Sequence, residues 1–328
     1  MLLRLLKSNT LFSPLMIPVI GFLFWFQGFQ SPVILDQNII QGAMPLYYLF
    51  YHYLAGQGFW QVFIGFTLVV INSFFVAQLG SSFLILKRQS YLPGIIYVIT
   101  VSSVKGLQAL LPVHLATFFV LVSILFIFDT YHKKVEITYT FNASFFLAVA
   151  SLFYLPVLVL FPLVWISIFV LQKEDNWRVL IIPIIGFSTP WLFVWAYSFL
   201  NDSFSSVWKE IIIMLWSRNN SYLIDPFFLS LTAVVTFMTT LGSLSVISAY
   251  HRMKVSSRKY FVIFYWMLGL VLVSALALIS IGIEIVILST IPVVYFISHY
   301  LLSDKKMIWK EVLAWIYLVT MVSALFLY

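Results

Sequence analysis

The sequence contains no cysteine, which excludes disulfides, thiolate catalysis, cysteine-ligated zinc and iron–sulfur clusters. Charged residues are also scarce. They make up 9% of the 328 residues, whereas a water-soluble domain carries about 25%. So few charges cannot cover a globule of this size in water, and the composition predicts an integral membrane protein. Polar linkers are absent as well, which predicts a single membrane-embedded domain over residues 1–328.

Runs of about 20 apolar residues predict membrane helices, and here they predict an all-α, polytopic protein with about eleven of them. The clear spans lie near Leu11–Gly28, Phe59–Leu86, Leu92–Lys105, Pro112–Phe128, Val179–Leu200, Pro226–Tyr250, Phe261–Ser280, Ile283–Leu302 and Val312–Leu327.

The segment Ser144–Leu171 is a special case. As one helix it would be about 42 Å long, which is too long for one crossing of a hydrocarbon core of about 30 Å and short for two. Proline lacks the backbone donor that a helix needs, so Pro156 and Pro162 are the expected break points. We therefore expect a hairpin of two short helices that enters and leaves on one side.

The 18 basic residues exceed the 11 acidic ones, and their placement predicts topology rather than nucleic-acid binding. Loops rich in Lys and Arg stay in the cytoplasm, so we expect a cytoplasmic N-terminus. No small-residue cleavage site follows Gln27 or Gly28, so we expect the first helix to be retained. The residues expected inside are Arg4, Lys7, Lys87, Arg88, Lys133, Lys134, Lys173, Arg178, Arg252, Lys254, Arg258, Lys259, Lys305, Lys306 and Lys310.

The inner basic clusters at 252–259 and 305–310 are expected to contact anionic lipid headgroups. Docking of a cytoplasmic partner protein is the alternative.

Two outer segments, 29–58 and 201–225, are long enough to hold structure of their own. The first contains an aromatic run from Leu46 to Leu54. In the second, apolar residues from Phe204 to Trp216 recur at helical spacing. Both patterns predict a helix that lies on the outer membrane surface.

Two carboxylates are candidates for chemistry. Asp36, at the start of the first outer segment, could act as a general base on an acceptor hydroxyl, or it could cap a short helix. Glu284 lies among isoleucines near the outer end of a late helix. A carboxylate there is functional by default in lipid, or it sits at headgroup depth and is solvated.

Lys105, Lys209 and Arg218 are the basic residues expected outside. They could neutralise a lipid phosphate, or they could extend to the interface and cap helix ends. His114 is expected to be a packing residue rather than a ligand, because no carboxylate or second histidine lies near it in sequence. We expect neither a metal site nor a cofactor.

The stretch FNASFFLAVASLFYLPVLVLFPLVWISIFVLQKEDNWRVLIIPIIGFSTPWLF, from Phe141 to Phe193, resembles an uncharacterised family of polytopic inner-membrane proteins from Bacteroidota. Those proteins share a motif like FDASF, then ASLFY, then a polar turn that leads into a PxxG helix. Asn142 stands where that family often has Asp. The resemblance implies that the protein lies in a bacterial inner membrane. It implies no activity.

The order of features also resembles the GT-C membrane glycosyltransferases. Those enzymes have an acidic residue and surface helices in the first outer loop, a broken helix pair in mid-chain, and a late helix with a central proline. Asp36, the hairpin at 144–171 and the segment ILSTIPVVYFISHYLL occupy those places. The resemblance implies that Asp36 activates the acceptor and that an outer basic residue holds polyprenyl phosphate.

Three functions therefore remain open from the sequence. The first is an envelope-biogenesis enzyme that uses a polyprenyl-phosphate sugar at the outer face. The second is a non-catalytic scaffold that holds envelope proteins together. A lipid or solute transporter is third, because transporters usually have paired interrupted helices and only one interrupted hairpin is visible here.

Overall fold

The computed structural model describes residues 12–32, 44–54, 56–131, 136–171, 177–216, 226–277, 284–303 and 307–327. Every regular element within these ranges is a helix, which confirms the all-α prediction. Seven of these helices are long and apolar enough to cross a membrane. The chain therefore has the helices of a membrane protein.

The helices of the first half are α2 (Phe12–Gln30), α4 (Pro45–Leu54), α5 (Gly58–Ser82), α6 (Leu92–Ser102), η1 (Lys105–Leu107), α7 (Pro112–Asp129), α8 (Glu136–Ser151), η2 (Leu155–Leu160) and α9 (Pro162–Leu171). Those of the second half are α10 (Trp177–Leu200), α11 (Phe204–Trp216), α12 (Pro226–Ala249), η4 (Tyr250–Arg252), α13 (Val255–Ala277), α14 (Ile285–Leu302) and α15 (Met307–Leu327).

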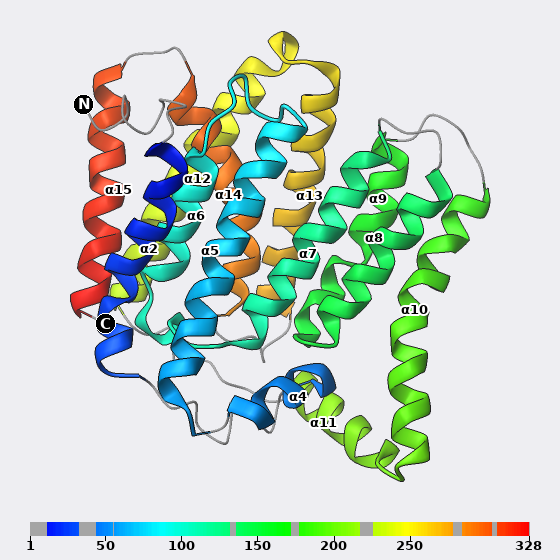
Figure 1. Ribbon diagram of the computed structural model, residues 1–328. Coiled ribbons are helices and arrows are strands. Elements are labelled where there is room, and N and C mark those ends of the chain that lie inside the picture. The colour runs from blue at the N-terminus through cyan, green and yellow to red at the C-terminus, as the bar shows by residue number, and fades with distance from the viewer. Residues whose placement is uncertain are drawn as a thin grey trace.

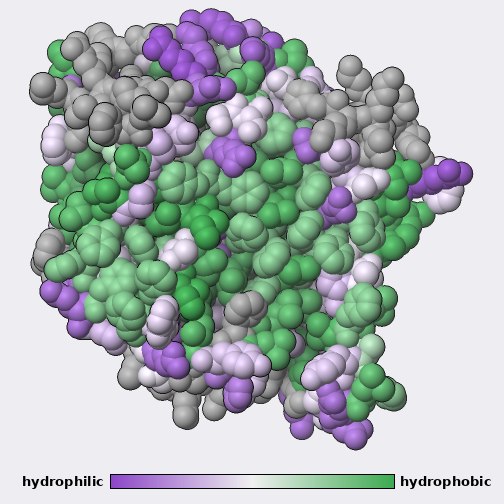
Figure 2. Space-filling model, viewed as in Figure 1, coloured by the Kyte–Doolittle hydropathy of each residue, from purple (hydrophilic) through white to green (hydrophobic). Residues whose placement is uncertain are grey.

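Helix α14 runs through the middle of the bundle and packs against α6, α7, α12 and α13 (Figure 1). Most of its side chains are buried, whereas α10, α12 and α15 present most of theirs to the outside. Figure 2 shows the result on one face, where a broad apolar belt separates two hydrophilic ends. The belt is the surface that hydrocarbon would cover.

Helices α8 and α9, joined by η2, form a hairpin. The start of α8 and the end of α9 lie at the same end of the bundle (Figure 1). The chain turns at residues 152–154, Pro156 lies within η2, and Pro162 begins α9. The first arm begins at Glu136 rather than at Ser144, so it is longer than the hydropathy predicted. Its first two turns contain polar residues such as Thr138 and Asn142, so a search for runs of apolar residues did not include them.

Most of the described Lys and Arg residues lie at or next to the end of α5, the starts of α10, α13 and α15, and the end of α12. These helix ends form the upper end of the bundle in Figure 1, here called the basic end. Two contacts tie its segments together: Ser257 Oγ donates to the carbonyl of Leu84 at 2.9 Å, and Lys259 Nζ lies 5.2 Å from the ring centre of Tyr131. The residues at this end are Lys87, Arg88, Arg178, Arg252, Lys254, Arg258, Lys259 and Lys310. Lys105 and Lys209 lie at the other end, here called the opposite end.

The contact between α12 and α14 depends on Gly242. A Cβ atom at this position would overlap the backbone carbonyl of Phe296. The two helices can therefore approach this closely only without a side chain here, as at other small-residue interfaces in membranes.

We expect Gly242→Val to destabilise the protein by about 2 kcal/mol or more, because the added side chain must push α12 away from α14. The measurement is thermal unfolding in detergent. Gly269→Ala is the matched control, because no atom lies within 4 Å of the Cβ position there. Alanine is the better helix former, so this control should unfold at the same or a higher temperature. Equal unfolding temperatures for Gly242→Val and the parent would contradict the packing argument.

Candidate functional site

Helices α4 and α11 lie across the opposite end and close over the turn of the α8–α9 hairpin (Figure 1). Met44, just before α4, and Ile211 of α11 are both buried in one apolar cluster with Leu152 and Leu155. The prediction of a helix in each outer segment is confirmed. One apolar face of each helix packs on the protein, and the expected position on the outer membrane surface stays a prediction.

The other faces of these two helices are exposed and aromatic. On α4, Tyr48 and Tyr53 are exposed, and on α11 the same holds for Phe204, Trp208 and Ile212. Aromatic rings of this kind suit the boundary between hydrocarbon and water. The two helices therefore offer a place where an amphiphile can approach the opposite end from the bilayer.

Tyr47 fixes α4 to the bundle. Its hydroxyl donates to the carbonyl of Leu110 at 2.6 Å, and its side chain is completely buried. Burial, and then the negative charge of Glu284 and the neighbouring Tyr51, raise the pKa of Tyr47. The phenol therefore stays protonated and remains a hydrogen-bond donor.

Glu284 precedes the first turn of α14 and is partly buried. Its carboxylate is close enough to act electrostatically on Tyr47 of α4 and on Tyr154 in the hairpin turn. Burial raises the pKa of this carboxyl to about 7. A fully solvated carboxylate would keep its usual pKa, so Glu284 is partly withdrawn from water, and its functional role stays a prediction.

A buried polar group lies between α2, α6 and α7. Gln108 Nε2 donates to the carbonyls of Phe24 at 3.1 Å and Ser102 at 2.8 Å. Trp25 Nε1 donates to Ser102 Oγ at 2.8 Å. These bonds hold the short helix α6 and its following loop against α2.

His114 belongs to the same region and makes the structural contacts expected of a packing residue. Its Nε2 lies 3.0 Å from the carbonyl of Leu107, and its own carbonyl accepts from Asn72 Nδ2 at 3.0 Å. A carbonyl only accepts, so Nε2 carries the proton and Nδ1 of the neutral ring is an acceptor.

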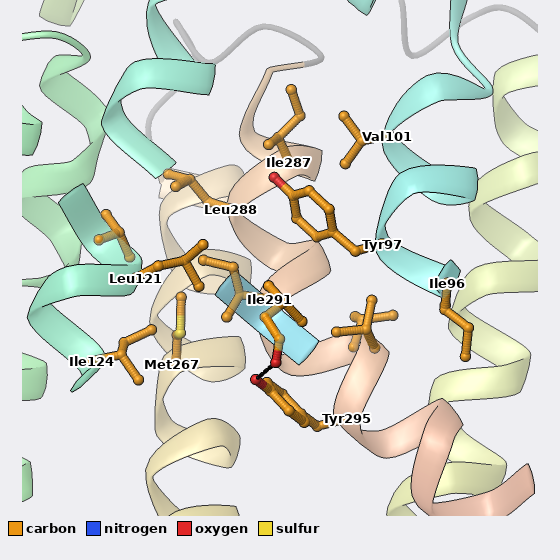
Figure 3. Close-up of a cluster of buried hydrophobic side chains, with 14 of the residues drawn as sticks. Ile96, Tyr97, Val101, Leu121, Ile124, Met267, Ile287, Leu288, Ile291 and Tyr295 are labelled. Carbon is orange, nitrogen blue, oxygen red and sulfur yellow. Dashed lines mark hydrogen bonds between the residues drawn. The ribbon is translucent and has the colours of Figure 1, made fainter. Parts of the chain in front are cut away.

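Two buried polar atoms here have no hydrogen-bond partner among the described residues. They are Gln108 Oε1 and His114 Nδ1. The Tyr97 hydroxyl lies near the side chains of Asn72 and Thr117. In Figure 3 the Tyr97 hydroxyl points toward the Ile287 end of α14, the end that begins at Glu284. Unpaired polar atoms in hydrocarbon are costly, so they need a polar partner. These buried atoms, together with Glu284 and its neighbours Tyr47 and Tyr154, make up the candidate site at the opposite end.

The remaining candidates contribute unequally. Lys105 is partly buried in η1, and Lys209 is exposed on α11. Asp36 and Arg218 lie outside the described residues. Within the part of the chain that the structure describes, no group of three or more His, Asp or Glu side chains could hold a metal ion.

Sequence reasoning missed Asn72, Tyr97 and Tyr154 as members of this site. A signal existed for Asn72, because an amide in the middle of an apolar helix is a functional hypothesis by default. The tyrosines carried no such signal, since the sequence has 18 of them.

A family model described as a family of unknown function (DUF6427) matches residues 85–328. The chain belongs to this family. The match begins just after α5 and includes Glu284, Gln108 and His114. It confirms the expectation of an uncharacterised family. Neither a curated protein nor a solved structure matches the chain.

We expect Gln108→Leu to lower the stability of the protein by about 2 kcal/mol, because it removes two buried hydrogen bonds that join the loop after α6 to α2 and to the end of α6. Thermal unfolding in detergent measures the effect. Gln78→Leu is the matched control, since Gln78 is exposed on α5. The proposed bracing role of Gln108 would be wrong if both variants unfolded at the parent temperature.

Proposed function

We propose that the protein is an inner-membrane enzyme of bacterial cell-envelope biogenesis, which transfers a sugar from a polyprenyl-phosphate carrier at the opposite end. The observation that carries this proposal is the partly buried carboxylate of Glu284 in electrostatic contact with Tyr47 and Tyr154. A GT-C-like arrangement of about eleven helices, an origin in Bacteroidota and a cytoplasmic N-terminus belong to the same proposal.

The chemistry requires a base near the membrane surface. The acceptor hydroxyl attacks the anomeric carbon of the sugar, its proton passes to a carboxylate, and the bond to the carrier phosphate breaks. A base works best when its pKa is close to the working pH. Burial raises the pKa of Glu284 to about 7. Asp36 is the base that the GT-C resemblance implies. Glu284 is the carboxylate that the described geometry supports.

The departing phosphate needs positive charge, for which Lys105, Lys209 and Arg218 are the candidates. The exposed aromatic faces of α4 and α11 support an amphiphilic substrate, because they offer rings at the depth of its headgroup.

A non-catalytic scaffold in an envelope complex is the second candidate, and the filled interior favours it. Tyr97, Phe264, Tyr295 and Phe296 are completely buried in the middle of the bundle. The end of α10 also exposes large apolar side chains, including Phe193, Tyr197 and Phe199, which a partner helix could cover. The same filled interior gives a transporter less support.

We expect Glu284→Gln to reduce the enzyme's function by about 10² to 10⁴-fold, because glutamine keeps the shape but cannot accept the proton. The readout is complementation of a deletion strain, with membrane abundance measured in parallel. Glu311→Gln at the basic end is the control and should complement fully. Asp36→Asn is tested beside them, since asparagine caps a helix as well as aspartate does. Full complementation by both Glu284→Gln and Asp36→Asn would leave the scaffold as the function.

The orientation can be tested directly because the parent chain has no cysteine. Single cysteines at the exposed positions Lys209 and Lys254 report on the two ends. We expect a membrane-impermeant maleimide added outside the inner membrane to label Lys209→Cys and not Lys254→Cys. Labelling of both after permeabilisation is the control. The reverse pattern would place the basic end outside.

A further inference from the structure

The basic end contains a cavity of about 420 Å³ that the proposed enzyme site does not use. It lies between the segment after α5, the end of α12 with η4, the start of α13 and the end of α14. Its size is that of a small-molecule site. Two contacts brace its walls: Ser257 Oγ donates to the Leu84 carbonyl, and Ser245 Oγ lies 3.3 Å from His299 Nδ1.

The charged residues that line this basic-end cavity, among those the structure describes, are all positive. Lys87, Arg252 and Lys254 line it, and no Asp or Glu is among its lining residues in the described chain. Lys310 adds a fourth positive charge behind the wall: it is almost fully buried and donates to the backbone and side-chain oxygens of Ser303, which lines the cavity. Walls of one charge sign focus the field on a ligand of the opposite sign. The cavity therefore selects an anion.

The donors suit a phosphate group. The hydroxyls of Ser245, Ser248 and Ser257 are engaged with neighbouring protein groups. Arg252 and Lys254 also line the cavity, and both residues are exposed, so their guanidinium and ammonium groups are accessible to a ligand. Arginine binds phosphate with two parallel hydrogen bonds, and lysine adds a point charge.

The rest of the wall is apolar and continues onto the lipid-facing surface. Leu84, Met253 and Leu302 line the cavity, and Leu84 is 43% exposed. Ser248 of α12 also lines it, and Leu244, four residues earlier, is 61% exposed. Residues four apart share a helix face, so an apolar path leads from the cavity down α12. A free phosphate ion would need no such path.

We propose that the basic-end cavity binds the phosphate of an anionic amphiphile, with Arg252 and Lys254 on the phosphate and the hydrocarbon chain along Leu84 and Leu244. The chemistry recognised is a phosphate monoester on an apolar chain. A phosphatidic acid of the bilayer and a polyprenyl phosphate both supply it. The site lies at the other end of the bundle from Glu284, so this proposal can be tested independently of the proposed glycosyl transfer.

The test uses the full chain in nanodiscs of phosphatidylcholine. Phosphatidic acid, polyprenyl phosphate and inorganic phosphate are titrated separately, and binding is read from retained lipid in native mass spectrometry and from the unfolding temperature. We expect at least one of the two amphiphiles to bind and to raise the unfolding temperature, and the tighter of them identifies the source. Inorganic phosphate at the same concentration should do neither.

Two variants locate the site. The double variant Arg252→Gln with Lys254→Gln should weaken amphiphile binding at least about tenfold. Ser248→Trp should weaken it as well, because the indole fills the cavity without changing its charge. The matched control is Arg88→Gln with Arg178→Gln, which removes two exposed cations of the same end that do not line the cavity. It should bind as the parent does.

Three results would overturn the proposal. The first is equal loss of binding in the control, which would mean diffuse attraction to a basic surface. The second is an equal rise of the unfolding temperature with inorganic phosphate, which would mean that the apolar path does not contribute to binding. The third is binding of neither amphiphile to the parent protein.

Discussion

The packing of α14 against its neighbours places both polar ends of the molecule. Tyr295, near its middle (Figure 3), donates to the carbonyl of Val76 on α5 at 2.7 Å and stacks on Phe264 of α13. The next residue, Phe296, touches α12 where Gly242 has no side chain. With contacts on several sides, α14 cannot shift along its axis without breaking some of them.

The two ends of α14 carry the two sites. Glu284 precedes its first residue, and His299 and Ser303 line the basic-end cavity at its other end. Eighteen residues of helix separate them, about 27 Å, which is close to the thickness of a hydrocarbon core. The charges agree with the helix dipole, since an acid lies at the N-terminus and cations gather near the C-terminus.

Lipid as a solvent explains why the polar groups are so few. Within the described helices most buried hydroxyls donate to a carbonyl of their own helix, as Thr117 and Ser144 do. Among the described residues, the exceptions include Gln108 and His114 near the end where Glu284 lies, and Tyr260 and Ser298 nearer the basic end.

The amino-acid pattern alone determined the all-α class of the protein, a hairpin that includes Pro156 and Pro162, and the helices α4 and α11. All of these follow from composition, from local periodicity or from proline, which act over a few residues. The count of about eleven membrane helices stays a prediction, since seven described helices are long and apolar enough to cross a membrane. The pattern did not reveal that Tyr47 and Ile211 pack on protein rather than lipid, because both surroundings are apolar. Only the tertiary structure brought Lys87 beside Arg252, and Glu284 near Tyr47 and Tyr154. Such contacts depend on which helices pack together. Packing in turn depends on the fit of side-chain shapes between segments far apart in the chain.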